Sequence, residues 1–336
     1  MSIAFTICSN NYLAQAKVLV DSIIEHSSNV KLYLGLCDER STLIDYSVYN
    51  CEVIEVKEIG IENFDSLWKK YDIIELCTSI KASFFKYLIN RNPNADFIYY
   101  FDPDICMYQS IIFLNNEFDD NTDILLTPHI TTPIPLDKKS PNENSFLHCG
   151  IYNLGFLGLR TLSSHSKKLL DWWEERTLTM GFNKTQEGLF VDQLWMNLVP
   201  LYFEKVKITK KLGYNVAPWN LHERRYIIKI AEGNYNMPDN SKLVFYHFSG
   251  YKFKLPNQMA YTRYTFEDVP QLIELYETYH NKLIANNILA LSQIACVYME
   301  RQNKRLKKKL YKAIRSFINP IFSLLKNKIK SYFVYE

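Results

Sequence analysis

The stretch Asp96–Tyr108, DFIYYFDPDICMY, places two aspartates one residue apart directly after a run of aromatic and β-branched residues. Such a run is typical of a buried strand. Asp102 and Asp104 therefore follow the end of that strand, where the repulsion between the two carboxylates must be offset by another charge or by solvent. A divalent cation would supply the compensating charge, because alternate carboxylates offer the oxygen ligands that Mg²⁺ or Mn²⁺ prefers. The alternative is a solvated acid pair in a turn that Pro103 sets.

Strand and helix patterns alternate along the chain around this segment. The order implies an α/β fold with a mixed, mostly parallel central sheet and flanking helices. Ligands bind beyond the carboxyl ends of the strands in such sheets, which is where the two aspartates are expected. The predicted strands are residues 2–8, 31–37, 51–56, 95–101 and 122–128, and the predicted helices are residues 12–25 and 75–90.

The second half of the chain continues this pattern. Asp192 and Gln193 fall near the start of one predicted helix, and His247 falls near the end of a late predicted strand. No domain boundary is apparent before about residue 270. The predicted elements are a pair of strands at 148–160, helices at 164–177 and 187–199, a strand at 242–250, and helices between 270 and 300.

Composition narrows the class of protein. The chain has 336 residues, of which 47% are hydrophobic and 22% charged, an ordinary globular composition. Its seven cysteines are scattered and include no CxxC pair, which argues against a disulfide framework or a zinc ribbon and favours a reducing compartment. The N-terminal residues do not resemble a standard export signal, and no stretch reaches about 18 uninterrupted apolar residues. We therefore expect neither standard export nor a membrane span.

Charge is distributed unevenly along the chain. Residues 301–336 hold eleven Lys and Arg against Glu336 alone, a charge of +10, which leaves −7 for the other 300 residues given the net charge of +3. An acidic body without a recognised nucleic-acid module argues against nucleic-acid binding. A basic amphipathic helix in the tail predicts docking on an anionic membrane surface, and packing against a partner subunit is the alternative. Pro320 would kink that helix. Its apolar positions recur at helical spacing from Leu306 onward: Leu310, Ala313, Ile314, Phe317, Ile321, Leu324, Leu325, Ile329 and Tyr332.

Six blocks of sequence carry a resemblance to a known enzyme class. The chain resembles nucleotide-sugar-dependent glycosyltransferases of the A-type (GT-A) fold, most of all family eight and related bacterial lipopolysaccharide and capsule glycosyltransferases. The resemblance implies a Rossmann-like domain at 1–268. The residue patterns predict a C-terminal helical region at 269–300 and a basic, membrane-associating tail at 301–336. The blocks are FTICSNNYLAQAKVLVDSI (5–23), the segment SIKASFFKYLI to DFIYYFDPDI (79–105), YNLGFLGLR (152–160), VDQLWMN (191–197), YNVAPWNLHER (214–224) and VFYHFSGYK (244–252).

The resemblance implies a metal site and a diphosphate site. Asp102, Asp104 and His247 would hold Mn²⁺ or Mg²⁺, and Asp102 would also contact the nucleotide. Gly250 would let the backbone approach the diphosphate, and Lys252 would offset its charge. Family eight has a Lys-Pro-Trp segment six residues after the histidine, where this chain has Phe253 flanked by Lys252 and Lys254. Which lysine contacts the diphosphate therefore stays open.

The remaining implied roles concern the nucleotide and the two sugars. Uridine would lie on the first turn, against Ile7, Ser9, Asn11 and Tyr12. Lys86 aligns with a family arginine that reaches the nucleotide, and it and Lys81 are otherwise solvated helix charges. The catalytic residues facing the donor sugar would be Asn153, Asp192 and Gln193, although Asp192 is also explained as the first acid of a helix. Near the acceptor the resemblance implies Trp219, Asn220 and His222, with a buried core tryptophan as the alternative for Trp219.

The function that the resemblance implies is transfer of a hexosyl unit from a UDP-sugar to a hydroxyl of a growing bacterial cell-surface glycan: lipopolysaccharide, O-antigen or capsule. The acceptor would be a glycan or glycolipid, and the enzyme would be cytoplasmic and peripheral on the inner face of the membrane. Retention is implied, with Gln193 or Asp192 facing the reacting carbon, whereas inversion needs a base such as Asp192 or Glu223. Two alternatives are an Asp-x-Asp phosphatase with Asp102 as nucleophile and a non-catalytic sugar-nucleotide-binding protein.

Overall fold

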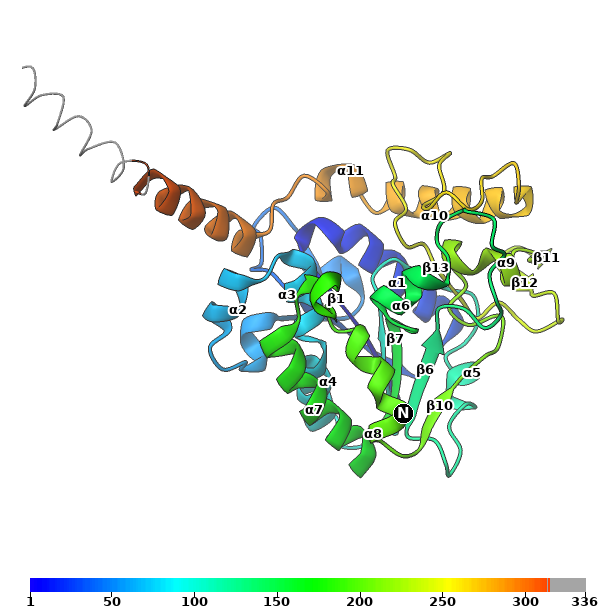
Figure 1. Cartoon of the computed structure of the whole chain (residues 1–336), viewed down its shortest axis with the longest axis horizontal. Coiled ribbons are helices and arrows are strands. Elements are labelled where there is room, and N and C mark those ends of the chain that lie inside the picture. The colour runs from blue at the N-terminus through cyan, green and yellow to red at the C-terminus, as the bar shows by residue number, and fades with distance from the viewer. Residues whose placement is uncertain (313, 315–336) are drawn as a thin grey trace, which may run out of the picture.

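The computed structural model describes residues 1–312 and 314 (Figure 1). Its centre is a seven-stranded sheet with the order β10-β6-β7-β4-β1-β2-β3. Only β7 runs antiparallel to its neighbours β4 and β6, and the other pairs are parallel. The predicted α/β class with a mixed, mostly parallel sheet is confirmed. The strands are β1 (Ser2–Cys8), β2 (Val30–Leu36), β3 (Glu52–Glu55), β4 (Phe97–Phe101), β6 (Ile124–Pro128), β7 (Tyr152–Arg160) and β10 (Val206–Ile208).

Helices cover both faces of the sheet. On β1, Phe5 packs with α4 and α7 in one apolar cluster, whereas its neighbour Ala4 packs with α1 in another. Both faces of this strand are buried, as expected of a central parallel strand. The helices are α1 (Leu13–His26), α2 (Phe64–Lys70), α3 (Ile73–Ser79), α4 (Lys81–Arg91), α5 (Ile112–Asn115), α6 (Glu143–Cys149), α7 (Ser164–Met180), α8 (Val199–Tyr202), α9 (Leu221–Arg224), α10 (Ile273–Ala285) and α11 (Ile288–Leu291).

The remaining strands of the described residues form three two-stranded ribbons. The pair that matters for function joins β5 (Ile105–Met107) to β13 (Phe245–His247), with His247 opposite Ile105. Because β5 begins one residue after Asp104, this pairing brings His247 beside the two aspartates. The other ribbons are β8 (Asn183–Lys184) with β9 (Leu189–Phe190), and β11 (Ile228–Ala231) with β12 (Asn234–Asn236).

Two predicted elements near the later site residues are wrong. Residues 148–160 do not form a pair of strands: they contain the end of helix α6 and the single strand β7, Tyr152–Arg160. Asn142 caps α6 by accepting a hydrogen bond from Ser145 N at 3.3 Å. Residues 187–199 do not form one helix. Gly188 and Val191 have φ values of 71° and 41°, so the chain runs through β9 and a turn before a 3₁₀ helix at Leu194–Leu198. Asp192 therefore does not begin a helix, and the helix-dipole explanation for it is wrong.

The other predicted elements need smaller corrections. Residues 75–90 form two helices, because Ile80 (φ −93°, ψ −1°) separates α3 from α4. The late strand is confined to β13. The region 270–300 is helical as predicted, apart from breaks that include residues 292–296.

A helix at 297–312 leaves the body at one side (Figure 1). Asp38, which is buried, accepts hydrogen bonds from Val297 N and from Asn10 Nδ2, both at 2.9 Å. Arg301 binds both carboxylate oxygens of Glu39 at 2.8 Å. From residue 303 this helix is exposed on all sides, Leu306 and Leu310 included. Within the described residues, none of the helices combines the length and apolarity needed to cross a membrane.

Most of the predicted amphipathic tail falls beyond this helix. Ala313, Phe317, the kink at Pro320 and the apolar positions from Ile321 onward lie outside the described residues.

Candidate active site

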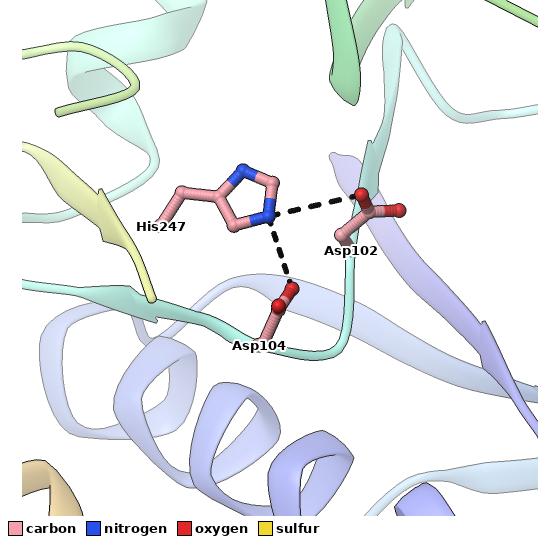
Figure 2. A group of neighbouring side chains, drawn as sticks. All are labelled: Asp102, Asp104 and His247. Carbon is pink, nitrogen blue, oxygen red and sulfur yellow. Dashed lines mark ion pairs between the residues drawn. The ribbon is translucent and has the colours of Figure 1, made fainter. Parts of the chain in front are cut away.

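Three predicted metal ligands lie together at the carboxyl end of β4 (Figure 2). His247 Nε2 is 3.0 Å from Asp104 Oδ1 and 3.8 Å from Asp102 Oδ2. One ligand atom from each residue lies within 4.8 Å of the other two. Two carboxylate oxygens and one imidazole nitrogen suit Mn²⁺ or Mg²⁺, so the donor set fits the implied cation. Burial alone would lower the pKa of His247, but Asp104 and then Asp102 outweigh it and raise that pKa.

The backbone around the triad is held from two sides. Asp102 N donates to Gly155 O at 2.7 Å, which ties the end of β4 to β7. Phe248 N donates to Asp104 O at 2.9 Å, which ties the Asp104 turn to the residue after His247. The Asp102 side chain accepts a further hydrogen bond from Tyr100 OH at 2.7 Å.

Gly155 leaves the space that the His247 ring occupies. A Cβ at this position would lie 2.5 Å from His247 Cε1 and 2.8 Å from its Nδ1. The described residues offer this Nδ1 no hydrogen-bond partner, and Figure 2 shows it on the side of the ring away from both aspartates. The sequence shows three glycines in this region, but only the packing shows that this one must stay small.

A buried lysine joins the triad to Asp192. Lys81 Nζ lies 2.9 Å from Asp192 Oδ2 and 3.4 Å from Asp102 Oδ1, and it donates to Leu154 O at 2.9 Å. Lys81 is 2% exposed and Asp192 is 1% exposed. Burial raises the pKa of Asp192 to about 6, although Lys81 opposes the rise. Burial also disfavours charged Lys81, but Asp102 and Asp192 more than compensate and raise its pKa.

A cavity of about 330 Å³ opens beside the aspartates. Along it, the four residues predicted to contact the nucleotide lie together with Asp102 and Asp104, and α3 contributes an apolar wall. The residues that line it include Ile7, Ser9, Asn11, Tyr12, Ile73, Ile74, Cys77, Thr78, Tyr100, Asp102 and Asp104.

The structure does not bring Lys86 to this cavity. Its Nζ pairs with Asp171 at 2.8 Å and Glu174 at 2.6 Å, both on α7, and the lysine that reaches Asp102 is Lys81. Gly250 has φ 71° in the loop after β13, a conformation that favours glycine. Lys252 follows in the same loop and is exposed.

The side chains of Asn153 and Gln193 are buried and bonded to each other. Asn153 Nδ2 donates to Gln193 Oε1 at 3.3 Å, and His129 Nε2 lies 3.2 Å from the same amide nitrogen. Asn215, at φ 53°, donates from Nδ2 to Asn153 Oδ1 at 3.0 Å. His129 and Asn215 are functional candidates that sequence reasoning missed, since a lone His or Asn after a strand is no signal without its partners.

The residues predicted near the acceptor make hydrogen bonds within the protein. Trp219 is buried and donates from Nε1 to His129 O at 3.1 Å, as the core alternative expects. Asn220 donates from its buried amide to the same carbonyl at 3.1 Å. His222 Nε2 lies 3.1 Å from Thr132 O. Glu223 accepts hydrogen bonds from the Thr131 and Thr132 hydroxyl groups, at 2.7 and 2.8 Å.

The stability of the fold should depend on the protonation of His129. Burial lowers the pKa of His129 to about 4, against about 6.5 in an unfolded chain. Between these values the unfolded chain binds a proton that the folded chain does not, so the contribution of His129 to stability falls as pH is lowered from about 6.5 to 4. That contribution has a slope of up to about 1.4 kcal/mol per pH unit. Because Asp192 and His247, whose pKa values are raised, contribute in the opposite sense, the test is the difference between proteins: the free energy of unfolding in urea should change with pH by up to this slope more in the wild type than in His129→Phe. Equal slopes would contradict it, and exposed His148→Phe is the matched control.

Comparisons with known proteins extend over most of the chain, although no family model matches it. Two relatives from Bacillus subtilis (strain 168) are the uncharacterised proteins YfnF and YfnD. YfnF is 28% identical over 277 residues, which cover 81% of this chain and 89% of YfnF. YfnD is 24% identical over 253 residues, which cover 73% of this chain and 76% of YfnD.

Three solved glycosyltransferases are similar in structure. The galactosyltransferase LgtC, in complex with donor and acceptor sugar analogues, is 16% identical, with a TM-score of 0.47 over 90% of this chain and all of LgtC. The bifunctional glycosyltransferase WbbM is 12% identical, with a TM-score of 0.49 over 90% of this chain and 51% of WbbM. GlyE of Streptococcus pneumoniae TIGR4 is 16% identical, with a TM-score of 0.45 over 92% of this chain and 63% of GlyE.

Proposed function

We propose that this chain is a metal-dependent GT-A glycosyltransferase that moves a hexosyl unit from a UDP-sugar to a hydroxyl of a growing bacterial cell-surface glycan. One observation carries the proposal: Asp102, Asp104 and His247 converge, and the two aspartates line a cavity together with Ser9 and Tyr12. The apolar wall from α3 would accept a base, and the three ligands would place the diphosphate at the open end.

The chain's own residues would bind and orient the donor for attack by the acceptor hydroxyl on the anomeric carbon. Bound Mn²⁺ or Mg²⁺ would supply Lewis-acid stabilisation of the departing UDP. Asp102, Asp104 and His247 would hold the cation, and Gly250 and Lys252 would lie along the diphosphate. Lys81, which lies 3.4 Å from Asp102, would keep that carboxylate ionised and oriented.

Two observations support retention of configuration. An inverting enzyme needs a carboxylate that can accept the proton of the acceptor hydroxyl. Asp192 is buried and paired with Lys81 at 2.9 Å, and Glu223 is occupied by Thr131 and Thr132. Neither carboxylate has the freedom expected of a base, so Gln193 is the group that we propose faces the reacting carbon.

The helix at 297–312 supports a membrane-linked acceptor. Its exposed surface combines Leu306 and Leu310 with the run Lys307–Lys309. Each lysine near an anionic surface adds about 1 kcal/mol to binding, and the leucines can enter the interface. We therefore propose that the enzyme works at the cytoplasmic face of the membrane, on a glycolipid precursor of lipopolysaccharide, O-antigen or capsule.

The test is a thermal-shift screen with Mn²⁺ against UDP-, GDP-, CMP- and dTDP-sugars. A ligand that binds only the folded state raises the midpoint, by mass action. We expect a shift with UDP-sugars that disappears when EDTA removes the cation. No shift with any nucleotide sugar in a folded sample would reject the proposal. Release of phosphate from a phosphomonoester would instead favour the phosphatase, and a shift without UDP release in the presence of an acceptor extract would favour a binding protein.

A further inference from the structure

Beneath the metal site lies a buried layer of four polar side chains, Asn153, Gln193, His129 and Asn215, which we name the amide layer. All four are less than 9% exposed. Amide and imidazole groups can each be turned by 180°, so their hydrogen-bonding roles must be deduced from partners whose roles are fixed. Backbone groups provide such partners here.

The backbone fixes the orientation of Gln193. Its Oε1 accepts a hydrogen bond from Leu154 N at 3.0 Å, and its Nε2 donates to Cys149 O at 2.7 Å. A backbone N–H can only donate and a carbonyl can only accept. The reverse orientation would place the Gln193 NH₂ against the Leu154 N–H and the Gln193 oxygen against the Cys149 carbonyl oxygen, which are two repulsive contacts. Gln193 therefore presents Oε1 to Asn153.

Asn153 is fixed in turn, and its hydrogen-bonding capacity is used up. Its Nδ2 faces Gln193 Oε1, and its Oδ1 accepts from Gly155 N at 3.1 Å and from Asn215 Nδ2 at 3.0 Å. The second N–H of the amide points to His129 Nε2 at 3.2 Å. Two donors and two acceptor sites are all occupied, so Asn153 has none left for a sugar hydroxyl.

These constraints determine the state of His129. Because Asn153 offers an N–H, His129 Nε2 must accept, and the ring proton must lie on Nδ1, which faces Ile151 O at 3.3 Å. The ring is held in place by Phe146, stacked with centroids 4.9 Å apart. A protonated ring would direct an N–H at the Asn153 amide, and burial correspondingly lowers the pKa of His129.

We infer that neutral His129 is a positioning residue that acts through Asn153 on Gln193, the residue proposed above to face the donor sugar. This inference rests on the proposed glycosyltransferase function. Gln193 Nε2 donates one N–H to Cys149 O and keeps a second N–H for a substrate. Asn153, by contrast, does not contact the substrate and only holds Gln193 in place. Loss of the His129 acceptor would free the Asn153 amide to turn, and Gln193 Oε1 would then keep its hydrogen bond from Leu154 N but lose the second one, from Asn153 Nδ2.

The first test needs no activity. In ¹⁵N-histidine-labelled wild-type protein at pH 7, the His129 ring should show the Nδ1–H tautomer. In ¹⁵N-glutamine-labelled protein, the side-chain amide signals of Gln193 should shift in His129→Phe and stay unchanged in the exposed control His148→Phe. An Nε2–H tautomer in the wild type would overturn the inference, whether or not any variant folds. So would Gln193 signals that ignore the loss of His129.

The second test separates positioning from packing. With Mn²⁺ and the UDP-hexose that the wild type uses, His129→Phe should lower kcat for UDP release about 100-fold, because small displacements of a positioned group have effects of that size. The KM for the donor should change less than about 3-fold. Asn153→Ala should match this loss, and the double variant should lose no more than Asn153→Ala. Additive losses would mean that His129 does not act through Asn153. If the wild type releases no UDP from any donor, the proposed function is rejected. The tautomer measurement would still test the hydrogen-bond assignment.

Discussion

Lys81→Met is expected to lower the free energy of unfolding by about 3–5 kcal/mol at pH 8, because it leaves Asp192 buried without its cation. Methionine keeps the length of the side chain, so the loss is mainly electrostatic. The deficit should shrink as pH falls. Burial already raises the pKa of Asp192 to about 6, and without Lys81 it would rise further, so the folded state would gain a proton that the unfolded state lacks. Urea unfolding at pH 8 and at pH 5.5 measures both effects.

Lys86→Met is the matched control for Lys81→Met. It makes the same change in the same helix, but the side chain of Lys86 is 37% exposed in its pairs with Asp171 and Glu174. Such surface pairs contribute about 0–1 kcal/mol, so the control should lose little stability. Equal losses in the two variants would show that Lys81 does not compensate a buried charge. Adding Asp192→Asn to Lys81→Met should recover part of the loss, since the uncompensated carboxylate is then gone.

Asp104→Asn is expected to abolish the dependence of UDP binding on Mn²⁺. The substitution removes a charged oxygen ligand from a group of three. Losing a residue that merely supports a metal ligand costs about 10–100-fold in affinity, so losing a ligand should cost at least about 100-fold. Isothermal titration with UDP, in the presence and in the absence of Mn²⁺, measures this.

Asp120→Asn provides the control for that experiment. Asp120 is an exposed aspartate in the loop before β6, and the change has the same chemistry and the same loss of charge. It should bind UDP with the wild-type dependence on Mn²⁺. If Asp104→Asn behaves like this control, the three residues are not the metal site, and the ion pair of Asp104 with His247 is only structural.

The strands that lead to the site could be predicted because each is a short, continuous apolar run. Asp102 and Asp104 are sequence neighbours at the end of such a run, so their proximity needed no tertiary information. His247 lies over 140 positions later, and only the resemblance associated it with the aspartates. The ribbon of β5 and β13 that brings it to them depends on pairing between distant segments, which no local pattern encodes.

Lys81 and Lys86 show why the rest could not be predicted. Five residues along an α-helix turn the side chain by about 140°, so the two lysines point to different sides. Which one faces the site depends on how α4 is rotated, and the break at Ile80 sets that rotation. The same holds for Asp192, whose local sequence suggested a helix start. The backbone there is held by distant groups, including Trp173 Nε1, which donates to Asp192 O at 3.0 Å.

The contact between Gly155 and the His247 ring should also constrain how these two positions vary during evolution. Two positions 92 residues apart share one volume, so they cannot drift independently: a methyl at the first would displace the imidazole at the second. Among descendants of a common ancestor, a glycine here should persist for as long as the histidine does and become free to vary once the histidine is lost. This pair of positions could therefore distinguish, from sequences alone, lineages that kept the proposed cation site from lineages that lost it.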